Sequence, residues 1–172
     1  MGRIDQMTVY HHTVDVRSHL NKPTFHDVTE AAREAISRSG IQLGTITVYS
    51  KHTTCSVIIQ EESHDTLYDG TEYLLQDLLD CLEAIVPTCR REGQYLHPGP
   101  KHIRHAVENL GEKAVWSLNT DAHIRSCLIG RSETIPIVNG LIELGEFGHV
   151  YFVDFDAVRT RDRTVQFQLL GD

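Results

Sequence analysis

Histidine is the residue type whose number and placement most suggest chemistry in this sequence. The 172-residue chain contains 11 histidines, and an imidazole can ligate a metal or exchange a proton near neutral pH. The candidates are His52, His97 and His123, although none belongs to a tight zinc motif such as H-E-x-x-H. A metal site would therefore have to be assembled from distant segments of the chain.

Each candidate histidine also has an ordinary structural explanation. His52 begins a polar segment between two predicted strands, where hydroxyls either contact a substrate or hydrogen-bond their own backbone. The hydroxyl-bearing neighbours are Thr53, Thr54 and Ser56. His123 follows Asn119 and Asp121, either of which suits the N-cap of a short helix. A nucleophilic pair of Cys55 with His52 is not expected, because no third group orients it.

Charged side chains supply a second set of candidates. Arg159, Arg161 and Arg163 alternate, so they share one face if a strand begins this early, and guanidinium groups suit phosphate oxygens. The alternative is a solvated strand end beside neighbouring aspartates. Arg131 and Ser132 can add further donors, and Glu61 is either an acid–base group or a solvated carboxylate.

The composition narrows the class of protein. The chain is 40% hydrophobic and 23% charged, which is ordinary for a globular domain, and its net charge of -8 argues against nucleic acid as a partner. No apolar run reaches the roughly 20 residues of a membrane helix, and residues 1–10 have no signal-peptide core. We expect one domain over residues 1–172, in the cytoplasm, with reduced cysteines and no membrane contact.

Periodicity predicts the elements that must position these residues. Alternation and β-branched runs predict seven strands, near residues 7–16, 45–49, 56–60, 134–138, 141–144, 150–155 and 164–169. Helical spacing with capping signals predicts a helix after Asp27 that ends at Gly40, and an apolar stripe predicts another between Leu74 and Leu82. Shorter helices are expected near residues 102–109 and 121–128. Because strands and helices do not alternate regularly, we expect an α+β fold with a mainly antiparallel sheet or sandwich.

Several of these segments occur in an order that resembles the YjbQ-like family, whose members are labelled secondary thiamine-phosphate synthases. The likeness begins with residues 52–56 and Glu61, and continues through Tyr95, His97, Asn119 and His123. It extends through residues 128–136 to Asn139-Gly140, then to Tyr151-Phe152, the arginine segment 159–163 and Gly171. The resemblance implies a two-layer β-sandwich of about seven strands with two or three helices, assembled as a homotrimer.

The resemblance also implies an activity. It would join a hydroxymethylpyrimidine diphosphate to a thiazole phosphate and release pyrophosphate, with the three histidines holding a divalent metal (Zn or Mg) or the leaving group. Glu61 and Asn119 carry over as their polar neighbours, and the three arginines would bind the phosphorylated substrate. Other readings are a metal-dependent phosphate-ester hydrolase and a non-catalytic binding protein. Phe147-Gly148 departs from the family's usual Trp-Gln, which leaves the substrate open.

Overall fold

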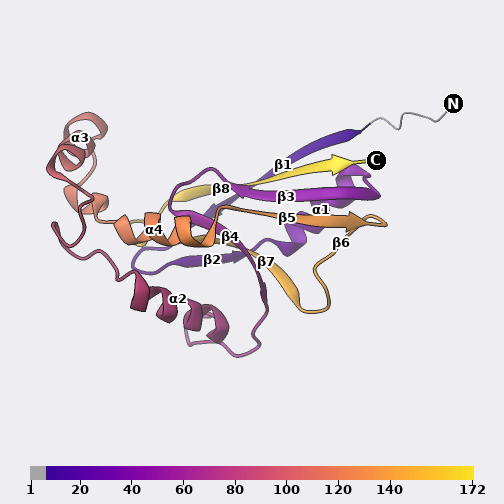
Figure 1. Ribbon diagram of the computed structural model, residues 1–172, viewed down its shortest axis with the longest axis horizontal. Coiled ribbons are helices and arrows are strands. Elements are labelled where there is room, and N and C mark those ends of the chain that lie inside the picture. Colours follow the sequence, from indigo (N-terminus) through magenta and orange to yellow (C-terminus); the bar gives the residue numbers. More distant parts are fainter. Residues whose placement is uncertain (1–6) are drawn as a thin grey trace.

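Two antiparallel sheets form the body of the protein in the computed structural model, which describes residues 7–172 (Figure 1). Residues 1–6, part of the segment in which we expected no signal peptide, lie outside the described residues. The larger sheet has the strand order β1-β8-β3-β5-β6 and the smaller one β2-β7-β4. The strands are β1 (Thr8–Arg17), β2 (Thr24–Asp27), β3 (Leu43–Ser50), β4 (Cys55–Glu61), β5 (Ser132–Val138), β6 (Leu141–Ile142), β7 (Gly148–Asp154) and β8 (Asp162–Gly171).

Four α-helices and one 3-10 helix accompany the sheets among the described residues. They are α1 (Thr29–Ser39), α2 (Tyr73–Ile85), α3 (Pro100–Leu110), η1 (Ala114–Ser117) and α4 (Thr120–Ile129). None of these helices has both the length and the apolar sequence needed to cross a membrane. The predicted α+β sandwich is therefore confirmed, with the short strand β2 added to the expected seven and, over residues 7–172, four α-helices plus a 3-10 helix in place of the expected two or three helices.

The main core lies between the two sheets and also contains the buried face of α1. Ile46 and Val48 of β3, Phe152 of β7 and Phe167 of β8 are completely buried there, together with Ala32 of α1. A second, smaller core forms where α2 and α4 pack on β7 and includes Leu82, Ala122 and Val153. The smaller sheet is therefore covered on both faces, by the larger sheet on one and by helices on the other.

Local signals in the sequence explain the ends of α1. The Asp27 carboxylate accepts a hydrogen bond from the Thr29 backbone N–H at 2.8 Å, which satisfies a donor in the first turn. Gly40 ends the helix in the left-handed region, with φ of 74°, and its N–H donates to the Ile36 carbonyl. The predicted end of the helix at Gly40 is confirmed, whereas the N-cap position is Val28, which makes no side-chain capping hydrogen bond.

The turn between β5 and β6 also follows its sequence signal. Asn139 and Gly140 have φ values of 54° and 72°, the pair of positive values that a tight type I′ hairpin requires. The hairpin continues the larger sheet at its edge, since Ile137 pairs with Ile142.

Candidate active site

Two connections that carry the chain from one sheet to the other meet at one end of the sandwich. Residues 51–54 join β3 to β4, and residues 155–161 join β7 to β8. Strand pairing places Cys55 opposite Asp154 and Ser50 opposite Val165. The β3–β4 and β7–β8 connections therefore lie side by side. Polar side chains more than 100 residues apart in sequence are thereby brought to a single site.

A cavity of about 350 Å³ lies at this end of the molecule, a volume within the usual range for small-molecule sites. Eight residues predicted from the sequence line it: His52, Thr53, Thr54, Asn119, His123, Arg159, Arg161 and Arg163. Lys51, His102, Glu112, Trp116, Ser117 and Asp156 complete the lining. Lys51 and the three arginines give the wall four cationic side chains against the carboxylates of Glu112, Asp156 and, behind the wall, Asp154, an excess of one positive charge that favours an anionic ligand.

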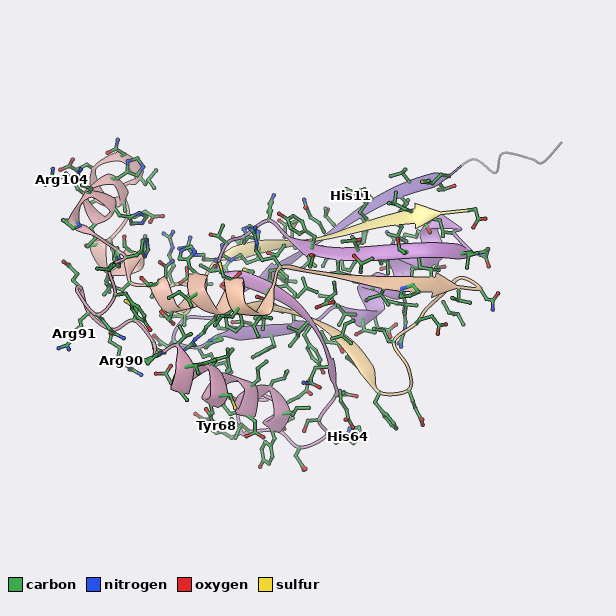
Figure 2. The ribbon with its side chains drawn as sticks, in the orientation of Figure 1. His11, His64, Tyr68, Arg90, Arg91 and Arg104 are labelled. Atoms are coloured by element: carbon green, nitrogen blue, oxygen red, sulfur yellow. The ribbon has the colours of Figure 1, made fainter. Side chains whose placement is uncertain are left out.

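His123 and His102 line the cavity, and His97, which does not line it, lies next to both of their rings. The ring centroid of His97 is 4.6 Å from that of His102 and 5.8 Å from that of His123. Burial lowers the pKa of His97, and the neighbouring rings of His102 and His123 lower it further. In contrast, His11 on β1 and His64 before α2 project into solvent (Figure 2). The structure thus selects a small group from the 11 histidines of the chain.

His52 approaches the same cavity from the β3–β4 connection. Its Nε2 atom accepts a hydrogen bond from the backbone N–H of Thr164 at 3.1 Å, which fixes the ring against the start of β8. Burial lowers the pKa of His52, and the positive charges of Arg163 and Lys51 act in the same direction. Burial also lowers the pKa of His123, with the Thr53 backbone acting against it. Neutral imidazoles are therefore favoured in the site near pH 7.

The three arginines are held by three carboxylates rather than by a shared strand face. Only Arg163 belongs to β8, whereas Arg159 and Arg161 precede the strand, so the condition for a shared strand face is not met. Arg163 Nε donates to Asp154 at 2.7 Å, and Arg161 pairs with the buried carboxylate of Asp156 at 2.9 Å. Arg159 pairs with Glu112 and stacks on the Trp116 ring, with its guanidinium carbon 4.4 Å from the ring centroid.

Three buried hydrogen-bond donors of this cavity lack a partner within residues 7–172. They are Ser117 Oγ, Arg159 Nε and Arg161 Nε. A buried donor without an acceptor costs free energy, and clusters of such donors are uncommon in folded proteins. All three belong to residues that line the cavity, which supports an anionic ligand there. This feature distinguishes the cavity from an ordinary network of surface ion pairs.

Four predicted site residues lie away from the cavity. Glu61 ends β4 at the opposite end of that strand from Cys55 and lines a separate hollow with Phe147. Ser56 is buried in β4, while Arg131 and Ser132 are exposed at the start of β5. Strand geometry explains the separation of Glu61, because six residues of β4 at about 3.3 Å each carry it roughly 20 Å from the end where the site forms.

The predicted metal centre can be tested against the side chains that the structure brings together. Within residues 7–172, no group of three or more His, Cys, Asp or Glu side chains is placed to hold one ion. His52 Nε2 is already used as an acceptor by Thr164 N–H. The arrangement therefore does not fit a preformed ion shared by His52, His97 and His123, and we derive no reaction step through one.

Several contributors to the cavity had no sequence signal strong enough to identify them. Ser117 and Trp116 lie on the short helix η1, between the two short helices expected near residues 102–109 and 121–128, where no element was predicted. Asp156 appeared in the sequence only as a neighbour of the arginines. The sequence shows an aspartate between a predicted strand and an arginine-rich segment, but it does not show that this aspartate is buried.

The departure at Phe147-Gly148 lies outside the cavity. Phe147 is exposed before β7, and Gly148 pairs with Glu61 at the start of that strand. A Cβ atom on Gly148 would lie 2.2 Å from the Leu144 carbonyl oxygen, so no larger residue fits this backbone. The two positions therefore lie at the start of β7 and not in the cationic cavity.

The comparisons with known proteins agree with this architecture. Residues 12–172 match the family described as UPF0047 protein YjbQ-like. A UPF0047 protein of Methanothermobacter thermautotrophicus is 30% identical over 135 residues, covering 78% of this chain and 76% of that protein. The UPF0047 protein YugU of Bacillus subtilis is 25% identical over 145 residues, covering 84% and 88%.

Two solved structures have the same fold. A YbjQ-like protein of unknown function from Sulfolobus solfataricus superposes with a TM-score of 0.71 at 21% identity, covering 97% of this chain and 100% of that one. An uncharacterized conserved protein of the YjbQ/UPF0047 family from Clostridium acetobutylicum gives a TM-score of 0.67 at 29% identity, covering 91% and 98%.

Proposed function

The chain belongs to the UPF0047 YjbQ-like family, and from this premise we propose that its cavity binds a small phosphorylated substrate and catalyses a transfer that releases pyrophosphate. The observation that carries the proposal is the set of three unpartnered donors, Ser117 Oγ, Arg159 Nε and Arg161 Nε, within residues 7–172. Phosphate oxygens accept hydrogen bonds in several directions at once, and guanidinium groups bind them well. A diphosphate supplies enough acceptors for all three donors.

The proposed reaction is the one implied by the family resemblance. A hydroxymethylpyrimidine diphosphate loses pyrophosphate as its methylene carbon forms a bond with the nitrogen of a thiazole phosphate. The thiazole nitrogen needs no base to attack, so positioning and charge neutralisation are the main demands on the protein. Arg159 and Arg161 would neutralise the leaving pyrophosphate, and Ser117 would donate to one of its oxygens.

Ser117→Ala gives the sharpest test of the anion site. Ser117 Oγ has no partner among the described residues, so its removal should leave the stability of the protein unchanged or raise it. Affinity for inorganic pyrophosphate should fall about tenfold, which corresponds to about 1.4 kcal/mol. Isothermal titration calorimetry measures the affinity, and a thermal melt measures the stability.

Arg161→Ala should weaken pyrophosphate binding more strongly than Ser117→Ala. The matched control is Arg104→Ala, because Arg104 projects into solvent from α3 (Figure 2). The proposed anion site is contradicted if pyrophosphate fails to bind the unmodified protein, or if it binds Arg161→Ala as well as Arg104→Ala.

An activity assay then separates the possible functions. Release of pyrophosphate only when both the pyrimidine diphosphate and the thiazole phosphate are present supports the transferase. Release of phosphate from simple esters instead would indicate a hydrolase, and binding without turnover would indicate a non-catalytic binding protein. Either of the last two results contradicts the proposed transfer.

The metal ion and the homotrimer implied by the resemblance remain proposals. Equilibrium dialysis with Zn²⁺ or Mg²⁺, on the unmodified protein and on His123→Ala, tests the first. Full retention of metal in a His52/His123 double variant would show that these two histidines do not hold it. Sedimentation at micromolar concentration tests the second, and a monomer would contradict it.

A further inference from the structure

Thr120 makes two hydrogen bonds to the same residue, His97. Its Oγ1 atom donates to the His97 backbone carbonyl at 2.5 Å and lies 2.8 Å from Nδ1 of the His97 ring. Thr120 is the first residue of α4 and is buried, so solvent does not compete for its hydroxyl. A threonine hydroxyl has a single hydrogen to donate.

This arrangement determines where the ring proton of His97 lies. Since the Thr120 hydrogen points to the carbonyl, the contact with the ring requires Nδ1–H as donor and Oγ1 as acceptor. A neutral imidazole has one N–H, so Nε2 is left with an open lone pair.

His52 has the same tautomer, but the protein engages its other ring nitrogen. Its Nε2 atom accepts from the Thr164 backbone N–H, so the hydrogen of the neutral ring lies on Nδ1. The ring nitrogen that the protein does not engage is therefore Nδ1–H, a donor, in His52 and Nε2, an acceptor, in His97. The two histidines have different chemical roles although the sequence presents them as equivalent.

We infer that Thr120 is a positioning residue that holds His97 in its Nδ1–H tautomer, which makes His97 Nε2 the hydrogen-bond and proton acceptor of the histidine cluster. The group that it accepts from is an N–H or O–H of the substrate that lies beside His102 and His123. This role in substrate binding rests on the proposed function, whereas the tautomer is a property of the ligand-free protein.

Nitrogen NMR tests the tautomer without any assay of activity. In ¹⁵N-labelled protein at pH 7.5, two-bond ¹H–¹⁵N correlations should place the His97 proton on Nδ1. Thr120→Val removes the acceptor with little change of shape, and His97 should then change to the Nε2–H form or to a mixture. Thr120→Ser retains the hydroxyl and should restore the Nδ1–H form.

His52 provides an internal control in the same spectra. Its tautomer depends on a backbone N–H that neither substitution removes, so it should remain Nδ1–H in all three proteins. A His97 proton on Nε2 in the unmodified protein, or an unchanged His97 spectrum in Thr120→Val, would overturn the inference. If the tautomer is as expected but pyrophosphate does not bind, the inference stands and the proposed function fails.

Discussion

Asn119 donates from its side-chain amide to the buried carboxylate of Asp156 at 3.2 Å. This contact is notable because Asn119 occupies the N-cap position of α4 but makes no side-chain capping hydrogen bond there. Asparagine at an N-cap normally satisfies a backbone donor of the first turn. In this protein its side chain instead holds the carboxylate that also pairs with Arg161.

Replacement of Asn119 should therefore affect ligand binding more than stability. Asn119→Ala loses no capping bond, but it releases one of the contacts that hold Asp156 and, through it, Arg161. We expect pyrophosphate affinity to fall about tenfold, or about 1.4 kcal/mol, while the free energy of unfolding falls by about 1 kcal/mol, the typical net value of one hydrogen bond. Calorimetric titration and urea denaturation measure the two quantities.

Asn109→Ala is the matched control for this experiment, because Asn109 is exposed on α3. It should change neither quantity measurably. A large loss of stability in Asn119→Ala with unchanged affinity would mean that Asn119 acts as an ordinary helix cap.

Arg163 should behave differently from the other two arginines. Its guanidinium bonds to Asp154 at 2.7 Å and to Thr54 Oγ1 at 3.0 Å, and both the arginine and the aspartate are buried. Removing one member of a buried ion pair leaves an uncompensated charge, so Arg163→Ala should lower the free energy of unfolding by about 3 kcal/mol or more.

The exposed pair Arg17–Asp162 provides the comparison for Arg163. Its atoms lie 2.9 Å apart, but 71% of the Arg17 side chain is accessible to solvent. Arg17→Ala should therefore cost less than about 1 kcal/mol. Similar losses in the two variants, measured by urea denaturation, would contradict the structural role assigned to Arg163.

Periodicity and capping signals predicted most of the fold because they report on local structure. Helix α1, the Asn139-Gly140 turn and seven of the strands follow from patterns within a dozen residues. Strand β2 was missed because Thr24–Asp27 is only four residues long and gains its strand character by pairing with β7. Tertiary pairing of this kind leaves little trace in a short segment.

The site was predicted only in part because its residues converge through chain connections. The family resemblance selected His52, Asn119 and His123, and the structure brings these together at the cavity. The resemblance also selected Glu61, which the direction of β4 carries away from them. Partners such as Ser117 and Asp156 become visible only when burial and hydrogen bonding are known, because neither follows from residue type.

Stability should depend on pH through the histidines of the site. Burial lowers the pKa of His123 in the folded protein below the ordinary value of 6.5. The unfolded chain therefore binds this proton at higher pH than the folded protein does, and the stabilisation is complete above about pH 6.5 and is lost as the pH falls below it. The urea concentration at the midpoint of unfolding should decrease when the pH is lowered from 7.5 to 5.5.

His123→Asn should make this decrease smaller, since the titrating group is gone. His64→Asn is the matched control, because His64 projects into solvent (Figure 2), and it should retain the full decrease. An identical pH dependence in His123→Asn and the unmodified protein would mean that His123 does not contribute.

The four cysteines should react in two distinct groups. Cys81 and Cys127 are exposed, whereas Cys55 and Cys89 are buried. Burial raises the pKa of Cys55 far above its ordinary value, and the nearby Asp154 carboxylate raises it further, so its thiol is both inaccessible and protonated. Thiolate is the reactive form of cysteine.

Iodoacetamide at pH 8 should therefore label Cys81 and Cys127 in the native protein, and Cys55 only after unfolding, as measured by mass spectrometry of peptides. Labelling of Cys55 at the rate of Cys81 would contradict this assignment and would make a Cys55–His52 nucleophilic pair the next hypothesis to test.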